Sequence, residues 1–241
     1  MTERKETLGS GLSIYVTREH GFGSDALLLA DFASPRKGAV VCDLGTGCGI
    51  IAMLILRDCA PSAVYAVDIS SCACELLERT VDENNLSGRL VCLNADLRNL
   101  KGLLPFGKFD AVTVNPPYKK LGTGLKNPDA ESCAARHEVC CDISDIAAAA
   151  RNLLKSSGKL YICQRPERLT EVLRVLSENA LEPKRIRFVS QKPGREPSLF
   201  LLEARKDAGE GMRVAPVLYI EHPDGGYTDE ARKIFEAYKE K

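Results

Sequence analysis

The sequence predicts an α/β fold in which a mostly parallel sheet of seven strands carries helices on both faces and an antiparallel hairpin at one edge. Two observations support this prediction. From residue 39 onward, short apolar runs alternate with longer amphipathic stretches, which is typical of parallel strands joined by crossover helices. Further along, two β-rich runs are separated by the turn-forming sequence KPGREP, which indicates a hairpin.

Each predicted element follows from its local pattern. Pro61 ends the first crossover helix, and the sequence SSG at 156–158 marks the end of a later one. Ahead of the sheet we expect a strand over 11–16 and a helix over 25–32 that is capped by Ser24. The strands of the sheet are predicted at 39–43, 63–68, 90–94, 109–114, 159–163, 184–190 and 198–204, and its helices at 50–57, 71–85, 142–155 and 168–179.

A length of 241 residues favours one domain. We divide it into an N-terminal extension over 1–38 that packs on the site, a catalytic core over 39–206 and a C-terminal extension over 207–241. No apolar run approaches the roughly 20 residues that a membrane span needs, and the sequence begins without an apolar signal core. We therefore expect a cytoplasmic protein, with a monomer as the default.

Charge is unevenly distributed although the net charge is zero. Residues 151–206 carry 13 Lys and Arg against 6 Asp and Glu, and both flanking regions are acidic. This basic segment is a candidate phosphate-facing surface, with an ordinary solvated face as the alternative. The polar stretch over 119–138 is long for a connection within a compact domain, and such loops are often functional.

The ten cysteines form no pair of CxxC units, and only three histidines accompany them. Cys42, Cys92 and Cys163 lie in apolar strand-like runs, where a thiol packs as a small hydrophobe. We interpret the cysteines as reduced structural thiols and expect no metal, with a metal site or a redox switch as the alternative.

A glycine-rich turn, DLGTGCG, joins the first strand of the sheet to its helix. Its glycines, Gly45, Gly47 and Gly49, allow a tight turn and a close approach to a ligand, and Thr46 lies between them. A dinucleotide site would place its third glycine one position later. The spacing instead resembles the motif that binds S-adenosylmethionine in class I methyltransferases. The helix N-terminus would then offer free N–H groups to the methionine carboxylate.

Acidic residues end three successive strands: Asp43, Asp68 and Asp96. Since the carboxyl ends of parallel strands form one edge of the sheet, these carboxylates should surround one site. Asp68 is predicted to bind the two ribose hydroxyls, and Asp96 the adenine amino group. Each residue has an alternative role: Asp43 could order the turn, Asp68 could cap the next helix, and Asp96 could lie in a surface loop.

The tetrapeptide Asn115-Pro116-Pro117-Tyr118 follows the fourth strand directly. Its prolines stiffen the backbone, and two acceptors, the Asn115 side-chain oxygen and the Pro116 carbonyl, can bond both hydrogens of an exocyclic amine. This clamp would aim the nitrogen lone pair at a methyl donor without a strong base, and Tyr118 could stack on the base. A rigid strand-ending turn is the alternative.

Together these motifs resemble the Rossmann-like class I amino-methyltransferases, and the fuller set resembles the bacterial valine-tRNA adenine-N6-methyltransferases. The narrower resemblance is carried by GFGSDALLLADF over 21–32, KNPD over 126–129, ARHE over 135–138, RPER over 165–168, LEPKR over 181–185 and the dipeptide YT at 227–228. It implies methylation of the adenine next to the anticodon. It also implies that Ser24 lines the methionine end of the cofactor pocket, although the helix after it could be a packed lid.

The resemblance implies a cofactor site and an RNA surface. The cofactor residues are Ser24, Asp43, Gly45, Thr46, Gly47, Gly49, Asp68, Ile69, Asp96, Leu97 and Asn115. The expected tRNA contacts are Lys119, Lys120, Lys126, Arg136, Lys184, Arg185, Lys192 and Arg195, with Arg187 nearby. For Arg136 the alternative is a surface turn that begins a helix.

Three other functions stay open. A protein-glutamine methyltransferase also uses NPPY but carries an N-terminal helical domain, for which the 38 residues before the first strand of the sheet are too few. Other rRNA or DNA amino-methyltransferases share the core, and the DNA enzymes usually add a recognition domain. A non-catalytic cofactor-binding scaffold belongs to a different class, and it would not need an intact NPPY.

Overall fold

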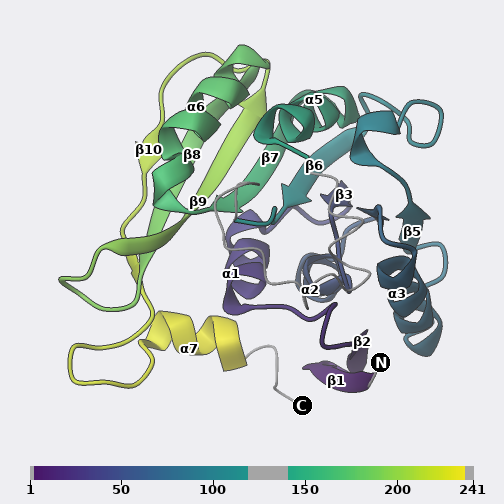
Figure 1. Ribbon diagram of the computed structural model, residues 1–241, viewed down its shortest axis with the longest axis horizontal. Helices are drawn as coiled ribbons and strands as arrows, with labels where there is room; N and C mark the ends of the chain where they lie inside the picture. Colours follow the sequence, from purple (N-terminus) through teal and green to yellow (C-terminus); the bar gives the residue numbers. More distant parts are fainter. Residues whose placement is uncertain (1–2, 119–140, 237–241) are drawn as a thin grey trace, which may run out of the picture.

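The computed structural model describes residues 3–118 and 141–236. Its central sheet contains nine strands in the order β10-β8-β9-β7-β6-β3-β4-β5, with β11 pairing beside β10 on β8 (Figure 1). Only β9 runs antiparallel to its neighbours, which confirms the mostly parallel sheet and its edge hairpin. The strands are β3 (Val40–Leu44), β4 (Ala63–Asp68), β5 (Leu90–Asn94), β6 (Phe109–Val114), β7 (Leu154–Gln164), β8 (Leu181–Ser190), β9 (Pro197–Lys206), β10 (Arg213–Val214) and β11 (Leu218–Tyr219).

The predicted strand count of seven is wrong because the C-terminal segment adds β10 and β11 to the outer side of β8. Each of these strands has only two residues, too few for the alternating pattern that identifies a strand in a sequence. The strands predicted at 63–68, 90–94 and 109–114 have the same bounds in the structure.

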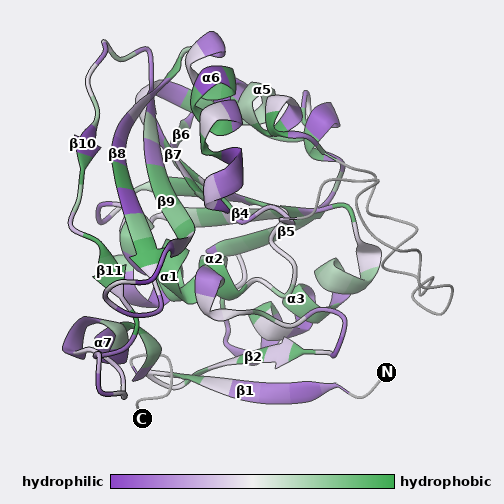
Figure 2. Ribbon diagram, turned by 60° about the vertical axis from the view of Figure 1, so that its left-hand side comes forward, coloured by the Kyte–Doolittle hydropathy of each residue, from purple (hydrophilic) through white to green (hydrophobic). Residues whose placement is uncertain are grey.

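Helices cover both faces of the sheet. One face carries α1 (Ser24–Ala33), α2 (Ile50–Cys59) and α3 (Ser71–Glu83), and the other carries α5 (Ile143–Leu153) and α6 (Leu169–Glu178) (Figures 1 and 2). Short 3-10 helices follow β5 at Leu97–Asn99 and β7 at Pro166–Arg168. Near the C-terminus, α7 (Asp229–Glu236) packs beside α1. Among the described residues, no helix is long and apolar enough to cross a membrane.

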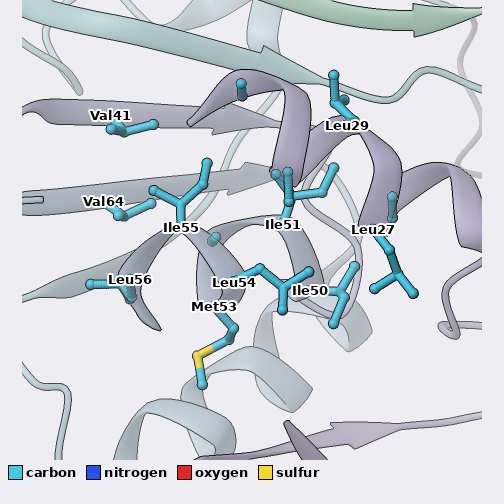
Figure 3. Packing of buried hydrophobic residues seen from close by; sticks show 14 of the residues in the cluster. Leu27, Leu29, Val41, Ile50, Ile51, Met53, Leu54, Ile55, Leu56 and Val64 are labelled. Atoms are coloured by element: carbon cyan, nitrogen blue, oxygen red, sulfur yellow. The ribbon is translucent and has the colours of Figure 1, made fainter. Parts of the chain in front are cut away.

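The helix that follows the glycine turn, α2, is enclosed by the core. All residues from Ile50 to Leu56 are buried, so this helix is apolar on every side, as expected for one enclosed by protein. Ile51 and Ile55 lie between α2 and the strands that carry Val41 and Val64 (Figure 3). On the remaining sides α2 packs against α1 and β2.

An N-terminal hairpin lies outside this layer (Figure 2). The predicted strand over 11–16 is present as β2 (Leu12–Val16), and β1 (Arg4–Gly9) pairs with it. The sequence did not indicate β1 because its first residues, RKET, are mostly exposed. The hairpin is attached to α3, since Asn84 accepts the Ser13 N–H at 2.8 Å and Thr80 Oγ1 accepts the Tyr15 N–H at 3.1 Å.

Several predicted boundaries differ from the structure by one to five residues, and two of these differences change how the sequence is interpreted. Gly23, not Ser24, is the N-cap of α1, and Ser24 is the first helical residue. The helix predicted over 142–155 ends at Leu153, and β7 begins at the next residue and runs through 156–158. The turn-forming residues there are accommodated inside the strand, where Ser157 has a φ of 63° and the register against β6 shifts.

Candidate active site

A cavity of about 380 Å³ opens at the carboxyl ends of β3, β4, β5 and β6. This is where open α/β sheets bind ligands. The predicted site residues that line it are Gly45, Asp68, Ile69, Asp96, Leu97, Asn115, Pro116 and Pro117. Ser24, Asp43, Thr46, Gly47 and Gly49 are outside its lining, and Ser24 is exposed. The cofactor contact predicted for Ser24 therefore stays a prediction.

The N–H groups of the glycine turn are already used within the protein. The Gly45 and Thr46 N–H groups donate to the Val67 carbonyl at 2.8 and 3.0 Å. The Gly47 N–H donates to Asp68 Oδ2 at 2.8 Å, and the Gly49 N–H donates to the Thr46 carbonyl at 2.9 Å. These hydrogen bonds fasten the end of β3 to the end of β4. The free N–H groups predicted for a carboxylate belong to the N-terminus of the next helix, which begins at Ile50, and their role stays a prediction.

Asp43 is a buried carboxylate beneath the turn, with 1% of its surface exposed. It accepts hydrogen bonds from the Thr46 and Thr113 hydroxyls, each at 2.6 Å. Burial raises the pKa of Asp43 to about 6, although the two hydroxyl donors oppose the shift. Asp43 thus orders the turn from below and has no surface on the cavity.

We expect Asp43→Asn to remove a pH dependence of stability. The unfolded carboxyl has a pKa near ~3.9 and the folded one near 6, so the folded state binds this proton more tightly. Tighter proton binding stabilises the folded state fully below about pH 4. As pH rises from about 4 to about 6 this contribution is lost, which lowers the free energy of unfolding by about 3 kcal/mol. Urea unfolding of both proteins from pH 4 to 7.5 measures this loss. A difference between them that does not change with pH would contradict it.

Asp68 lies at the end of β4 with both carboxylate oxygens engaged. Oδ2 accepts the Gly47 N–H and Oδ1 accepts the Ser70 N–H at 2.9 Å. The cap of α3 is Ser70, whose hydroxyl accepts the Ala73 N–H, so Asp68 is not itself the helix cap. Asp68 lines the cavity in a fixed orientation, and each oxygen keeps a further lone pair for a hydroxyl donor.

Asp96 also lines the cavity, and it is paired with Arg98. The Arg98 guanidinium donates to both carboxylate oxygens, at 3.0 and 2.6 Å, and the Arg98 N–H donates to Oδ1 at 2.9 Å. These hydrogen bonds lower the pKa of the Asp96 carboxyl. The side chain therefore stays an ionised acceptor, as a role beside an amino group requires.

The NPPY tetrapeptide is joined to α1 by a network of side chains. Asp25 accepts the Asn115 Nδ2–H at 2.9 Å and also the Tyr118 hydroxyl. The same hydroxyl lies 3.0 Å from Asn115 Oδ1 and 3.4 Å from Cys163 Sγ. Burial raises the pKa of Tyr118 well above its usual value, so its hydroxyl is a donor. The sequence did not indicate Asp25 as a partner, because 90 residues separate it from Asn115.

The predicted stacking of a base on Tyr118 would require Arg165 to move, because Arg165 already lies over one face of the ring. The Arg165 guanidinium carbon lies 5.0 Å from the centre of the Tyr118 ring, and Arg165 Nη1 donates to the Ser198 carbonyl at 3.2 Å. A base that stacks on this face must displace the exposed Arg165 side chain. Stacking by Tyr118 stays a prediction.

The structure separates the predicted RNA contacts. Lys192 and Arg195 lie in the turn after β8. Because β8 runs parallel to β7 and β6, this turn lies at the carboxyl ends of the strands, as NPPY does. Lys184 and Arg185 lie near the start of β8, toward the amino ends of these parallel strands. Lys119, Lys120, Lys126 and Arg136 lie outside the described residues.

Residues near the start of β8 also have internal partners. Arg185 lies 3.9 Å above the Phe32 ring, donates to the Phe32 carbonyl and pairs with Glu203 at 3.1 Å. The Lys184 Nζ donates to the Gly209 carbonyl at 3.0 Å, and Arg187 pairs with Glu230 at 2.7 Å through both carboxylate oxygens. The geometry does not bring Lys184 and Arg185 to the site.

Several cavity residues were missed by the sequence reasoning. Glu19 and His20 follow β2 and line the cavity, and His20 Nε2 lies 3.5 Å from Ser70 Oγ. Cys141, which lies just before α5, and Ile146 of α5 also line it. For Glu19 and His20 the only signal in the sequence was that they follow the strand predicted over 11–16, since they belong to no motif.

The cavity fits the cofactor that the glycine turn predicts. Its volume is in the range of small-molecule sites, and Ile69, Leu97 and Ile146 offer apolar surface for a flat base. The ionised Asp96 and the oriented Asp68 provide acceptors at two successive strand ends. The described residues contain no cluster of His, Cys, Asp or Glu that could hold a metal ion.

The fold and this site together define a methyltransferase. The methyltransferase small domain family matches residues 10–182, and the chain belongs to this family. It is an S-adenosylmethionine-dependent enzyme.

Three known proteins illustrate the relationship. A tRNA1(Val) (adenine(37)-N6)-methyltransferase from Porphyromonas gingivalis is 27% identical, over 85% of this chain and 82% of that protein. A predicted O-methyltransferase from Agrobacterium tumefaciens has the same fold, with a TM-score of 0.73 and 21% identity over 89% of this chain and 96% of that one. TrmN from Thermus thermophilus matches with a TM-score of 0.53 and 25% identity, over 75% of this chain and 48% of that one.

Proposed function

We propose that this methyltransferase acts on the N6 amine of an adenine in tRNA, the adenine next to the anticodon of a valine tRNA. The observation that carries the proposal is NPPY at the end of β6, with Asn115, Pro116 and Pro117 on the cavity wall. The name of the Porphyromonas gingivalis relative supports the same substrate. We place the reaction in the cytoplasm and in a single domain formed by the three parts defined above.

Asn115 and Pro116 perform the main work of the site. An exocyclic amine on adenine is a poor nucleophile because its lone pair is delocalised into the ring. Hydrogen bonds from its two N–H groups to Asn115 Oδ1 and the Pro116 carbonyl would hold the nitrogen and orient its lone pair. Such positioning of two reactants accounts for a large share of catalysis in many enzymes. No side chain has to remove a proton before the methyl group is transferred.

The cofactor residues would hold the donor beside this clamp. Asp68 would accept from the ribose hydroxyls and Asp96 from the adenine amino group, with Ile69 and Leu97 on the faces of the ring. When bound, S-adenosylmethionine supplies an electrophilic methyl group on a positively charged sulfur. Pro116, Pro117 and Ile146 add apolar surface to the same cavity.

The carboxyl ends of β7 and β8, beside NPPY, carry exposed positive charge that suits the phosphates of an RNA backbone. Arg165 and Arg195 are exposed, and Lys192 is partly exposed beside Glu221 at 3.3 Å. Contacts from lysine and arginine to phosphates provide affinity without reading the sequence. We assign the RNA surface to these three residues, together with the predicted contacts Lys119, Lys120, Lys126 and Arg136.

The proposal is tested by supplying S-adenosylmethionine labelled in the methyl group with unmodified tRNA, with protein from the same cells, or with neither. We expect label in N6-methyladenosine of tRNA, located by nucleoside analysis and mapping. Label only in a protein would support a glutamine methyltransferase. No label in any acceptor would support the non-catalytic scaffold.

Charge reversal at Lys192 and Arg195 should weaken tRNA binding. Loss of two phosphate contacts makes the slope of log K against log salt less negative by about 1.5 and lowers the affinity about tenfold or more at physiological salt. Lys108→Glu is the matched control, because this exposed lysine directly precedes β6 and therefore lies at the amino ends of the strands, away from NPPY. If affinity and slope both match the wild type, the turn is an ordinary solvated surface.

A further inference from the structure

The Asp25 carboxylate contacts NPPY from behind the active site. It belongs to the first turn of α1 and is half-buried. Its Oδ2 accepts both the Asn115 Nδ2–H at 2.9 Å and the Tyr118 hydroxyl. Asn115 lines the cavity, and Asp25 is not among the lining residues. Any effect of Asp25 on a bound amine must therefore pass through Asn115 or Tyr118.

The chemistry of this contact determines the orientation of the Asn115 amide. An asparagine side chain presents a donor at one end and an acceptor at the other, and a half-turn exchanges them. An ionised carboxylate can only accept, so it pairs with Nδ2 and would be repelled by Oδ1. The amide is thereby fixed with Nδ2 toward α1, and Oδ1 becomes the end that can accept from a substrate amine.

The same carboxylate also controls the Tyr118 hydroxyl. This hydroxyl has one proton and two nearby acceptors, Asp25 Oδ2 and Asn115 Oδ1 at 3.0 Å. A hydrogen bond to a charged acceptor is stronger than one to a neutral amide oxygen. The proton therefore goes to Asp25, and Asn115 Oδ1 keeps its accepting capacity for the substrate.

We infer that Asp25 is a positioning residue for the methyl-transfer reaction. It selects the orientation of the Asn115 amide in which the oxygen accepts from the amine, and it keeps the Tyr118 hydroxyl from competing for that oxygen. This inference rests on the proposed function, because it assumes that the acceptor is an amine bound by Asn115.

Asp25→Asn tests this role with almost no change in shape. The new amide can face Asn115 with either end, so the preference for one orientation is lost. We expect kcat for tRNA methylation to fall about tenfold to a hundredfold, the range for the loss of one or two charge-assisted hydrogen bonds. The KM for tRNA and the Kd for S-adenosylmethionine should stay within about twofold. Asp31→Asn, which removes an exposed carboxylate from the same helix, should leave kcat unchanged.

A double-mutant cycle separates positioning from a general structural role. In an Asn115→Ala background there is no amide to orient, so Asp25→Asn should change kcat less than about twofold further. If the two substitutions act additively, or if Asp25→Asn leaves kcat of the otherwise wild-type enzyme unchanged, the inference is overturned.

A measurement that needs no RNA keeps the two proposals distinguishable. The side-chain ¹⁵N–¹H resonances of Asn115, identified as those missing from Asn115→Ala, should show slow hydrogen exchange in the wild type and faster exchange in Asp25→Asn. Unchanged exchange would overturn the role of Asp25 whatever the substrate is. Changed exchange in a protein that methylates no adenine would overturn the proposed function and leave the Asp25–Asn115 contact standing.

Discussion

Replacing Asn115 with alanine is expected to lower kcat for methyl transfer by about a hundredfold to a thousandfold, the cost of removing one preorganised hydrogen-bonding group from an active site. The Asn115 side chain lies on the cavity wall at the end of β6, and its oxygen is one of the two acceptors for the amine. Single-turnover assays with unmodified tRNA and saturating S-adenosylmethionine would measure the methylation step directly.

Two controls make this result specific. Equilibrium binding of S-adenosylmethionine should change little, since Asp68 and Asp96 hold the proposed cofactor groups on neighbouring strands. Asn115→Asp keeps two acceptor oxygens but removes the donor to Asp25 and places two carboxylates together. It should be as inactive as the alanine variant. A rate for Asn115→Ala within about twofold of the wild type would remove NPPY from the mechanism.

Replacing Gly49 with alanine is expected to cost about 3 kcal/mol of stability. Gly49 has a φ of 89°, a conformation that costs a residue with a Cβ about 1 to 2 kcal/mol. An added Cβ would also overlap the buried Leu77 side chain of α3. Forcing a methyl group into a packed core costs a further 1 kcal/mol or so, and often more. Urea unfolding followed by circular dichroism measures the sum.

Gly88→Ala is the matched control for the Gly49 substitution. Gly88 has a similar φ of 80°, but an added Cβ would meet nothing within 4 Å. It should show only the backbone cost, about 1 to 2 kcal/mol. Equal losses at the two glycines would mean that Leu77 moves aside freely. Combining Gly49→Ala with Leu77→Ala should then recover nothing beyond the sum of the single effects.

The strands and the position of the site could be predicted from the sequence for a physical reason. A strand buried on both faces appears as a continuous apolar run, as β6 does, and the less buried β4 and β5 are also short apolar runs, so all three were found with their correct bounds. Motifs that directly follow such strands must lie at one edge of the sheet, which places Asp68, Asp96 and Asn115 around one cavity.

The side-chain partners could not be predicted in the same way. Whether Arg185 faces solvent or pairs with Glu203 depends on which strands become neighbours, and β9 lies between β8 and β7. The contact between Asp25 and Asn115 depends on how α1 packs against the end of β6. Both contacts join distant segments of the chain, and local periodicity carries no information about them.

The two short strands β10 and β11 cover part of the outer side of β8. They pair with Arg185, Ile186, Val189 and Ser190, and without them backbone N–H and carbonyl groups on the outer side of β8 would be unpaired. Such an exposed edge is a template on which another chain can add a strand, and it is a common starting point for aggregation. The family match ends at residue 182, before this segment. We expect the residues beyond it to protect this edge of the sheet from self-association.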